Sequence, residues 1–473
     1  MKMGVNKVFA SAKEAISDVE DGASIIFGGP GMIHFSPTTL IWALKEKGVK
    51  NLTAILNFPG IGPTNPLTLA DNKQIKKLIA AFGGIAGVPT LIEEQIKKGE
   101  VEFEMVPQGV LCERLRAGGA GMAAFYSPTG VGTMIEEGKE VRYFKGRKYL
   151  LENALTADFA FIPAYKADKM GNLIFRRTGR NFNPVFATAA KVVIAEVDEI
   201  VEPGEIDPDH VVTPSIYVDR IIKTQINRRE IATQFRTQMA KRVTVGGSIK
   251  RPEGMKPGLT RELIALRVAR ELEEGQWVNL GFGLPILVSQ FMPEGVNLHA
   301  EMGLMAYGPP PQTEADFDPY VTDAAGMFVT TKPGTACCTN LEAFAMARSG
   351  RLNTVVLGAF QVSQKGDLAN VWSPKMGAPG VGGAMDLVVG GSKVIIAMEH
   401  VTEDGEPRIL KECSYKLTAP HCVSLIVTDL AVIEVTDKGL VLHEVAPGWT
   451  PAEVQKYTGA PLIVSPDCQE ISM

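Results

Sequence analysis

The chain has 473 residues, of which 45% are hydrophobic and 21% charged, and its formal net charge is −5. This length exceeds what one hydrophobic core usually supports, so we expect two or more domains. The composition is typical of a soluble globular protein, and no run of Lys and Arg suggests a nucleic-acid-binding surface. Local donors must therefore bind any anionic ligand, because the overall field is mildly unfavourable to it.

The six cysteines and six histidines suggest neither a disulfide framework nor a metal site. No C-x-x-C or H-E-x-x-H motif occurs, and the adjacent Cys337 and Cys338 cannot form an unstrained bridge. No window reaches the ~18 apolar residues that a membrane span requires, and the N-terminus lacks the apolar core of a signal peptide. We therefore expect a cytoplasmic protein with reduced thiols, no metal and no membrane segment.

A glycine turn follows the first predicted strand. Ser11 and Glu14 predict a capping box that opens a short helix ending near Asp21, and a buried strand then covers Ala23–Phe27. This strand leads into a turn containing Gly28, Gly29 and Gly31. Backbone N–H groups after a strand commonly bind phosphate or carboxylate, although a plain tight turn is an equally good interpretation. The turn is not a dinucleotide fingerprint, because His34 occupies the last glycine position of that motif.

Strands and helices alternate through the first half of the chain. This alternation predicts a mostly parallel sheet covered by helices. The expected segments are the helix Thr38–Lys47, the strand Asn51–Asn57, and the further segments Leu78–Ala86, Thr90–Lys98 and Val101–Val106.

Gln108 follows the last of these strands, in Pro107-Gln108-Gly109. An amide at a strand end can donate a hydrogen bond into a cleft, although a solvated turn residue is the ordinary interpretation. A helix starting over Leu111–Arg116 is expected next. Residues 117–132 are so rich in glycine that we expect a long loop, and residues 144–218 suggest short strands and turns.

Residues 239–260 have the composition of a linker, with basic residues, glycines and prolines. They separate an N-terminal domain, 1–238, from a C-terminal domain, 261–473. The second half repeats the first: a helix over Arg261–Glu273, a strand over Trp277–Leu280, and a turn containing Gly281 and Gly283. The chain is therefore predicted to be an α/β protein of two similar open domains with mostly parallel sheets, a pseudo-repeat.

Glu301 lies between an apolar strand-like run and a turn rich in Gly and Pro. Taken alone, such a residue is more often a hydrogen-bonded structural carboxylate. A carboxylate nucleophile, however, is already ionised at neutral pH and requires no base, only an acyl donor, an oxyanion hole and a dry site. The G-x-S-x-G and P-loop motifs are missing. We therefore hypothesise that Glu301 is the nucleophile and that Gln108 and Gly383 donate to the oxyanion.

Several stretches together resemble the class I coenzyme A transferases, closest to the succinyl-CoA:3-ketoacid group. The resemblance covers nearly the whole chain, and its motifs are specific when they occur in this order. The stretches are GGPGM (28–32), EMVPQGVLCERLRAGGAGMAAFYSPTGVGT (104–133), AYKADKMGNLIFRRTGRNFN (164–183), NLGFGLP (279–285), LGAFQVSQKGDLANVW (357–372) and GVGGAMDLV (380–388).

The resemblance implies a ping-pong reaction on acyl-CoA and small carboxylic acids. Glu301 would correspond to the catalytic glutamate of a Ser-Glu-Asn-Gly motif and form a mixed anhydride and then an enzyme–CoA thioester. Gln108 and Gly383 would form the oxyanion site. Coenzyme A would be a substrate, no cofactor is expected, and a homodimer or higher homo-oligomer is implied. The glycines implied to shape the CoA and substrate cleft are Gly28, Gly29, Gly31, Gly281, Gly283 and Gly382.

Met302 departs from the family motif, which has asparagine at this place. A thioether lacks the amide's hydrogen-bonding groups, so the usual 3-ketoacid preference becomes questionable. Two alternatives stay open beside the transferase. One is an acyl-CoA hydrolase, in which water resolves the covalent intermediate, and the other is a catalytically silent CoA-binding subunit.

Overall fold

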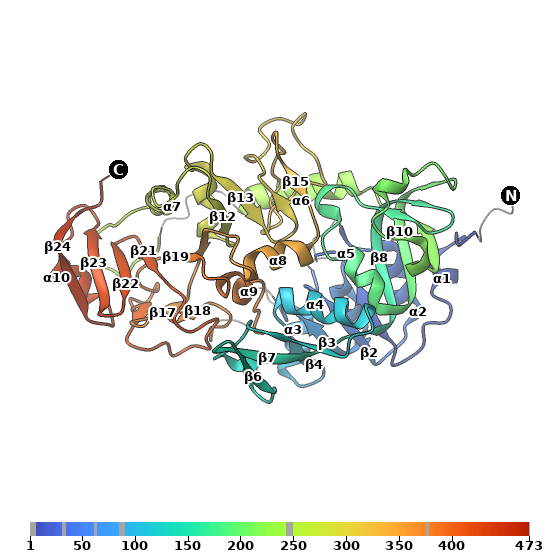
Figure 1. Cartoon of the computed structure of the whole chain (residues 1–473), viewed down its shortest axis with the longest axis horizontal. Helices are drawn as coiled ribbons and strands as arrows, with labels where there is room; N and C mark the ends of the chain where they lie inside the picture. The colour runs from blue at the N-terminus through green and yellow to red at the C-terminus, as the bar shows by residue number, and fades with distance from the viewer. Residues whose placement is uncertain are drawn as a thin grey trace.

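The computed structural model describes residues 6–30, 35–60, 64–84, 90–242, 249–374 and 378–472. Gly31 of the predicted glycine turn lies outside these residues. Figure 1 shows two halves side by side along the long axis, the first coloured blue to green and the second yellow to red. Each half is built on its own mostly parallel sheet with helices packed against it, which confirms the predicted α/β class.

The sheet of the first half has the order β11-β10-β8-β1-β2-β3-β4, and all neighbours along this path are parallel. Its middle strands are apolar and buried, as expected where helices cover both faces. The strands are β1 (Ser24–Phe27), β2 (Leu52–Leu56), β3 (Ile75–Ala80), β4 (Glu102–Met105), β8 (Ala157–Asp168), β10 (Ala190–Val201) and β11 (Arg220–Lys223), and β9 (Leu173–Ile174) pairs antiparallel with β8.

The helices of the first half include one that ends as predicted, since Gly48 caps α2 in the left-handed region at φ 75°. The α-helices are α1 (Ala12–Ala15), α2 (Thr38–Lys47), α3 (Leu91–Lys97), α4 (Gln108–Gly119), α5 (Asn183–Phe186) and α6 (Arg228–Arg242). Short 3₁₀ turns are η2 (Pro66–Asn72), η3 (Met134–Glu136), η4 (Arg177–Gly179), η5 (Ala187–Ala189), η6 (Pro208–His210) and η7 (Ser215–Tyr217). A small antiparallel sheet contains β5 (Ala124–Ser127), β6 (Val141–Phe144) and β7 (Arg147–Asn153).

The sheet of the second half has the order β15-β14-β13-β12-β16-β19-β21-β22-β23-β24. Its strands are β12 (Trp277–Leu280), β13 (Asn297–Ala300), β14 (Leu304–Met305), β15 (Ala336–Cys337), β16 (Thr354–Leu357), β19 (Lys393–Ala397), β21 (Leu425–Val427), β22 (Ala431–Thr436), β23 (Gly439–Val445) and β24 (Leu462–Glu470). A separate small sheet contains β17 (Gln361–Ser363), β18 (Leu368–Ala369) and β20 (Ile409–Leu410). The helices are α7 (Arg261–Ala269), α8 (Asn340–Arg348), α9 (Ala384–Val388), α10 (Pro451–Lys456) and the 3₁₀ segment η8 (Leu284–Gln290).

The strand topology confirms the repeat that the sequence predicts. β1 lies between β2 and β8 in the first half, and β12 lies between β13 and β16 in the second, with parallel pairing in each case. A helix precedes the first strand of each repeat, and a glycine turn follows it. The proposed boundaries at 238 and 261 remain predictions, and the first residues of the proposed linker belong to α6.

Three local expectations are wrong. The glycine-rich stretch 117–132 contains the end of α4 and the strand β5. Glycine is required there because a Cβ at Gly118 would lie 2.2 Å from the carbonyl oxygen of Leu155, so the helix packs closely against backbone. Residues 144–218 contain two strands of twelve residues, β8 and β10, in place of short strands. The first helix spans four residues only, although Ser11 caps it as expected.

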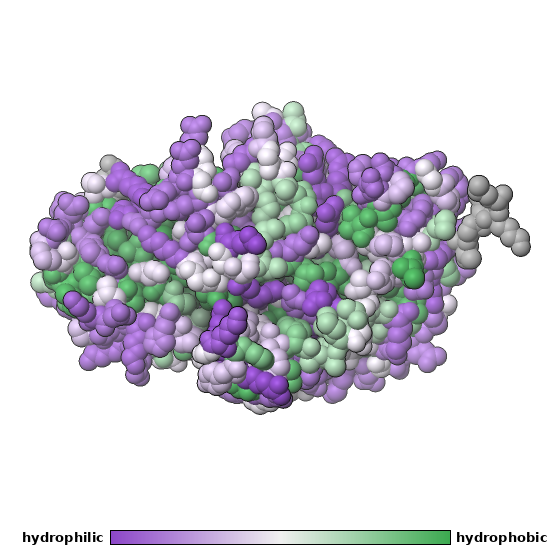
Figure 2. All heavy atoms as spheres, viewed as in Figure 1, coloured by the Kyte–Doolittle hydropathy of each residue, from purple (hydrophilic) through white to green (hydrophobic). Residues whose placement is uncertain are grey.

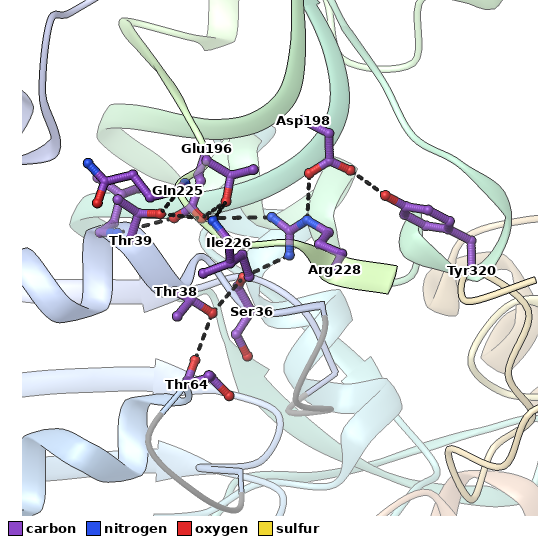
Figure 3. Close-up of polar contacts among 12 residues, drawn as sticks. Ser36, Thr38, Thr39, Thr64, Glu196, Asp198, Gln225, Ile226, Arg228 and Tyr320 are labelled. Atoms are coloured by element: carbon purple, nitrogen blue, oxygen red, sulfur yellow. Dashed lines mark hydrogen bonds and ion pairs between the residues drawn. The ribbon is translucent and has the colours of Figure 1, made fainter. Parts of the chain in front are cut away.

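A polar network at the start of α6 joins the two halves (Figure 3). The guanidinium of Arg228 donates through Nε to Oδ1 of Asp198 at 2.7 Å and through Nη1 to the carbonyl oxygen of Ser36 at 3.1 Å. The hydroxyl of Tyr320, from the second half, donates to the other oxygen of Asp198. A carboxylate of the first half is therefore bonded to a loop of the second.

The face seen in Figure 2 is mostly hydrophilic, and its hydrophobic residues lie in small groups between polar ones. Among the described residues, no helix is both long and apolar enough to cross a membrane.

Candidate active site

Glu301 directly follows β13, at the carboxyl end of a parallel strand. Ligands of open α/β sheets commonly bind at this edge. The chain turns sharply after Glu301, because Gly303 has φ 91° and a Cβ there would lie 2.1 Å from the carbonyl oxygen of Cys338. The turn leaves the Glu301 side chain partly exposed.

One buried asparagine holds the Glu301 carboxylate. Asn279, at the end of the neighbouring strand β12, donates from Nδ2 to Oε2 of Glu301 at 2.9 Å. The same nitrogen lies 3.1 Å from both Nδ1 and the carbonyl oxygen of His299. Asn279 and His299 are almost completely buried, so this arrangement is shielded from water.

Burial raises the pKa of Glu301, and the hydrogen bond from Asn279 partly opposes that rise. A second buried carboxyl group, Asp323, has its pKa raised to about 7, mainly by burial and further by the charge of Glu301. Its Oδ1 accepts the backbone N–H groups of Ala325 and Met327, each at 2.9 Å. The site therefore contains two carboxyl groups whose ionisations influence each other.

Gln108 and Gly383 come together although 275 positions separate them in the sequence. The backbone N–H of Gln108 donates to the carbonyl oxygen of Gly382 at 3.0 Å. A Cβ on Gly383 would lie 3.0 Å from Oε1 of Gln108 and 2.9 Å from the ring of Phe344. In the part of the chain that the structure describes, Nε2 of Gln108 has no hydrogen-bond partner. The side-chain amide of Gln108 thus lies beside the backbone of Gly383, with Oε1 as the nearer atom.

Helix α8 connects this amide–glycine pair with Glu301. Asn340, at the start of α8, donates from Nδ2 to the carbonyl oxygen of Glu301 at 2.7 Å. Phe344, one turn further along, packs against Gly383. Figure 1 shows α4, α8 and α9 together at the centre of the molecule, where the halves meet. The three residues predicted for catalysis therefore gather around one helix.

The loop that carries Gly382 and Gly383 is bound to the first half. Backbone N–H groups of Val381 and Gly382 donate to the carbonyl oxygen of Ala81 at 3.0 and 3.3 Å. Gly382 has φ 50°, and a Cβ there would lie 2.7 Å from the ring of Phe82. This position consequently requires glycine for packing as well as for backbone conformation.

The predicted glycine turns lie next to this centre. Gly29 donates its N–H to Oδ1 of Asn183 at 2.8 Å, and a Cβ on Gly28 would lie 2.5 Å from that oxygen. The carbonyl oxygen of the nearby Asn181 accepts from the N–H of Asn340 at 3.3 Å, which connects the turn to α8. Gly281 and Gly283 follow β12 directly, close to Asn279 in the chain. That these glycines bind coenzyme A remains a prediction.

Sequence reasoning missed Asn279, His299, Asn340 and Asp323. Two of them carried a signal, because Asn279 and His299 interrupt the buried apolar parts of their strands, VNL and LHA. Buried polar groups of this kind require partners, and here the partners include the candidate nucleophile. Asn340 and Asp323 lie in segments whose sequence suggests only a helix start and a turn.

No group of three or more His, Cys, Asp and Glu side chains could hold a metal ion among the residues described. The expectation that the protein needs no metal or cofactor stays a prediction.

Comparison with known proteins covers both halves. A family model described as "Coenzyme A transferase" matches residues 9–224 and 261–457. The human succinyl-CoA:3-ketoacid coenzyme A transferase 2, mitochondrial, is 39% identical over 98% of this chain and 90% of its own length. The mouse succinyl-CoA:3-ketoacid coenzyme A transferase 2A, mitochondrial, is 40% identical over 96% of this chain and 89% of its own. One of the subunits of a probable succinyl-CoA:3-ketoacid coenzyme A transferase from Bacillus subtilis is 50% identical over 46% of this chain and 90% of its own.

A solved structure shares the fold. The acyl-CoA transferase of E. coli O157:H7, determined as a thioester complex with CoA, has a TM-score of 0.77 at 21% identity and covers 98% of this chain and 95% of its own. The two-domain fold and the matches over both halves define an enzyme that transfers coenzyme A between an acyl-CoA and a carboxylic acid. The chain belongs to the coenzyme A transferase family.

Proposed function

We propose that this enzyme moves coenzyme A between a short-chain acyl-CoA and a 3-oxoacid, by a ping-pong reaction through a thioester on Glu301. One observation carries the proposal: α8 bonds the backbone of Glu301 at its first turn and packs against Gly383 at its second. The names of the relatives, succinyl-CoA:3-ketoacid transferases, support the substrate class. Coenzyme A enters as a substrate, and a carboxylate nucleophile requires no resident cofactor.

In the first step, an oxygen of ionised Glu301 attacks the carbonyl carbon of the acyl-CoA. The C–S bond breaks, coenzyme A leaves as the thiolate, and an acyl–glutamyl anhydride remains. Nε2 of Gln108 and the N–H of Gly383 would stabilise the negative charge on the acyl oxygen. No proton is transferred, because both the nucleophile and the leaving group are anions.

In the second step, the thiolate attacks the glutamyl carbonyl carbon. The bond between this carbon and the bridging oxygen breaks, which releases the first carboxylate and leaves a glutamyl–CoA thioester. An incoming acid then attacks the thioester as a carboxylate, and the same two steps in reverse yield the new acyl-CoA. The reaction must exclude water, because water would hydrolyse the anhydride or the thioester.

The decisive experiment adds acetyl-CoA or succinyl-CoA without an acceptor acid and then quenches with borohydride or hydroxylamine. Mass spectrometry of the peptide containing Glu301 should show modification in the wild type and none in the isosteric variant Glu301→Gln. Steady release of free coenzyme A without acceptor would instead support a hydrolase. An unmodified Glu301 in a protein that binds coenzyme A would support a silent binding subunit.

Met302 bears on the choice of acid. Its side chain is 3% exposed, and its sulfur lies 3.8 Å from Nδ2 of Asn340, the group that bonds the Glu301 backbone. Met302 therefore acts on the site through Asn340. Assays of single acceptor acids with both acyl-CoA donors, in the wild type and in Met302→Asn, measure this effect. A specificity for 3-oxoacids in both proteins supports the substrate proposal, whereas exclusive use of acids without a 3-oxo group contradicts it.

We further propose that the enzyme is a homodimer or higher homo-oligomer, which the family resemblance supports. We also propose that it is cytoplasmic. Light scattering of the purified protein measures the oligomeric state.

A further inference from the structure

Two polar side chains that the proposed transfer steps do not use lie buried near Glu301. Tyr307 is 5% exposed and Asp323 is 3% exposed. The negative charge of Glu301 raises the pKa of both groups, and the charge of Asp323 also raises the pKa of Tyr307. Because such effects decay with distance, the three side chains lie in one neighbourhood.

The backbone brings Tyr307 and Asp323 together from two segments. Tyr307 follows β14, the strand that returns antiparallel to β13 after a sharp turn. The N–H of Gly308 donates to the carbonyl oxygen of Thr330 at 2.8 Å. Thr330 ends a short hairpin, 321–330, whose arms are joined by backbone hydrogen bonds of 2.9 and 3.2 Å, and Asp323 begins its turn. The two polar residues therefore belong to segments that are hydrogen-bonded to each other.

The hairpin that carries Asp323 is also bonded to the first half. The N–H of Thr322 donates to the hydroxyl of Thr178 at 3.2 Å. The N–H of Thr178 donates in turn to the carbonyl oxygen of Tyr320 at 2.9 Å. The position of Asp323 is therefore determined by both halves, as expected for a residue of a site at their junction.

Both side chains have a polar group without a partner. Oδ1 of Asp323 accepts the N–H groups of Ala325 and Met327, each at 2.9 Å. In the part of the chain that the structure describes, neither Oδ2 of Asp323 nor the hydroxyl of Tyr307 makes a hydrogen bond. Buried polar groups nearly always have partners, so a pair without them requires an explanation. A polar group of the substrate supplies one.

The two groups present O–H donors rather than charges. Burial raises the pKa of Asp323 to about 7, and the charge of Glu301 contributes to this rise. The proton resides on Oδ2, because Oδ1 already accepts two N–H groups. Burial likewise raises the pKa of Tyr307 well above its ordinary value, so its hydroxyl is neutral. A ketone oxygen only accepts, and its two lone pairs match two such donors.

The neighbourhood of Glu301 does not suit a second negative charge. Among the residues described, no positive side chain acts on the pKa of Glu301, Asp323 or Tyr307. Arg180 donates through Nη1 to the carbonyl oxygen of Cys337 at 3.4 Å, and its charge acts on the Cys337 thiol instead. A carboxylate at the far end of an acyl chain would therefore be desolvated beside Glu301 without a cationic partner, which is costly.

We propose that Tyr307 and Asp323 determine specificity by binding an uncharged oxo group on the third carbon of the acyl chain, and that they disfavour acyl groups ending in a carboxylate. The inference rests on the proposed function and narrows its substrates. The third carbon lies two bonds beyond the carbon that Glu301 attacks, so its oxygen falls in the neighbourhood of both donors. Acetyl-CoA suits this site as a donor, and succinyl-CoA does not.

The first test compares acetoacetate with butyrate, an acid of the same length without the oxo group. Transfer from acetyl-CoA to each acid gives a ratio of kcat/KM values. Tyr307→Phe removes one donor and keeps the ring, so this ratio should fall about fivefold, through the acetoacetate value alone. Tyr457→Phe is the matched control, at a half-buried tyrosine that packs against Trp449 with ring centroids 5.7 Å apart. An unchanged ratio in Tyr307→Phe, or an equal fall in the control, overturns the assignment.

The second test compares two variants of Asp323 at about pH 6, where the carboxyl group carries its proton. In Asp323→Asn the amide nitrogen can donate in place of Oδ2, and the amide oxygen can keep the N–H groups of Ala325 and Met327. This variant should keep the preference for acetoacetate over butyrate, whereas Asp323→Ala should lose about fivefold of it. Thermal unfolding checks that both variants are folded, and Tyr307→Phe decides alone if the alanine variant is not. A preference lost equally in both variants, or kept in both, overturns the donor role of Asp323.

The third test addresses the excluded charge. Rapid-quench measurements give the rate at which the wild type forms the glutamyl–CoA thioester from acetoacetyl-CoA and from succinyl-CoA. Succinyl-CoA should react at least about tenfold more slowly. A succinyl-CoA reaction as fast as that of acetoacetyl-CoA overturns the exclusion, and its loss in Arg180→Met would identify Arg180 as the partner of the terminal carboxylate.

The outcomes separate this inference from the proposed function. If no acyl-CoA modifies Glu301, the proposed function fails. If Glu301 forms the thioester and the preference for acetoacetate is the same in the wild type, Tyr307→Phe and Asp323→Ala, this inference alone is overturned.

Discussion

The carboxylate of Asp386, in the second half, accepts the backbone N–H of Gly109, in the first half, at 2.9 Å. Gly109 follows Gln108, so this bond fixes the start of α4 against α9. The other oxygen of Asp386 accepts from Thr129 and Arg348, each at 3.1 Å, and the side chain is completely buried. The position of the candidate oxyanion amide therefore depends on a buried charge contributed by the opposite half.

Replacement of Asp386 by alanine should destabilise the protein by about 3 to 5 kcal/mol, because it leaves the guanidinium of Arg348 buried with one partner fewer. Urea unfolding measures this cost. The control is Glu94→Ala, which removes an exposed helix pair with a 3.8 Å separation and should change stability by less than about 0.5 kcal/mol. Equal stabilities for Asp386→Ala and the control would contradict the role assigned to this carboxylate.

A methyl group on Gly383 should abolish most activity. The added Cβ would lie 2.9 Å from the Phe344 ring and 3.0 Å from Oε1 of Gln108, so one of these side chains must move. A displacement of about 1 Å in a catalytic group can cost roughly 100-fold in rate. Steady-state kinetics of Gly383→Ala test this, with Gly358→Ala as the control, because a Cβ there has no neighbour closer than 4.0 Å. Wild-type kcat in Gly383→Ala would exclude Gly383 from the oxyanion site.

The regular elements were predictable where local pattern and tertiary environment agree. The helix Thr38–Lys47 begins and ends as expected because the apolar periodicity and the Gly48 cap act together. The glycine-rich stretch 117–132 does not form the expected long loop, because its first glycines allow close packing of α4, which depends on residues distant in the sequence.

The candidate site was predictable only where its residues stand in a recognisable local pattern. Glu301 follows a recognisable strand and Gln108 begins a helix. The family resemblance predicts that both residues belong to one site. The Asn279–His299 arrangement depends on the register of two strands, which no local pattern contains. Asp386 acts across the junction of the halves, and a sequence gives no information on such a contact until the fold is known.

Asp323 should make stability depend on pH. Its folded-state pKa is about 7, above the ordinary value of 3.8, so the folded protein binds its proton more tightly than the unfolded chain does. The resulting stabilisation is complete below about pH 3.8 and is lost as the pH rises to about 7. The loss is on the order of 4 kcal/mol.

The variant Asp323→Asn cannot ionise and still offers an oxygen to the N–H groups of Ala325 and Met327. It should be more stable than the wild type at pH 8, and this advantage should disappear as the pH falls towards 4. Urea unfolding at several pH values compares the two proteins. A stability difference that does not change with pH would contradict the raised pKa.

Tyr320 should contribute to the junction of the halves through its hydroxyl group. The hydroxyl donates to Asp198, which also bonds Arg228 (Figure 3). The backbone oxygen of Tyr320 accepts from the N–H and hydroxyl of Thr178 at 2.9 and 2.7 Å. Tyr320→Phe removes the hydroxyl and keeps the backbone bonds and the contact of the ring with Arg176. Because the lost hydrogen bond is to a charged group, the free energy of unfolding should fall by about 1.5 to 3 kcal/mol.

Tyr143→Phe, at a residue that is 68% exposed, is the matched control and should not change the free energy of unfolding measurably. If both variants unfold at the wild-type urea concentration, the bond between Tyr320 and Asp198 contributes nothing to holding the halves together.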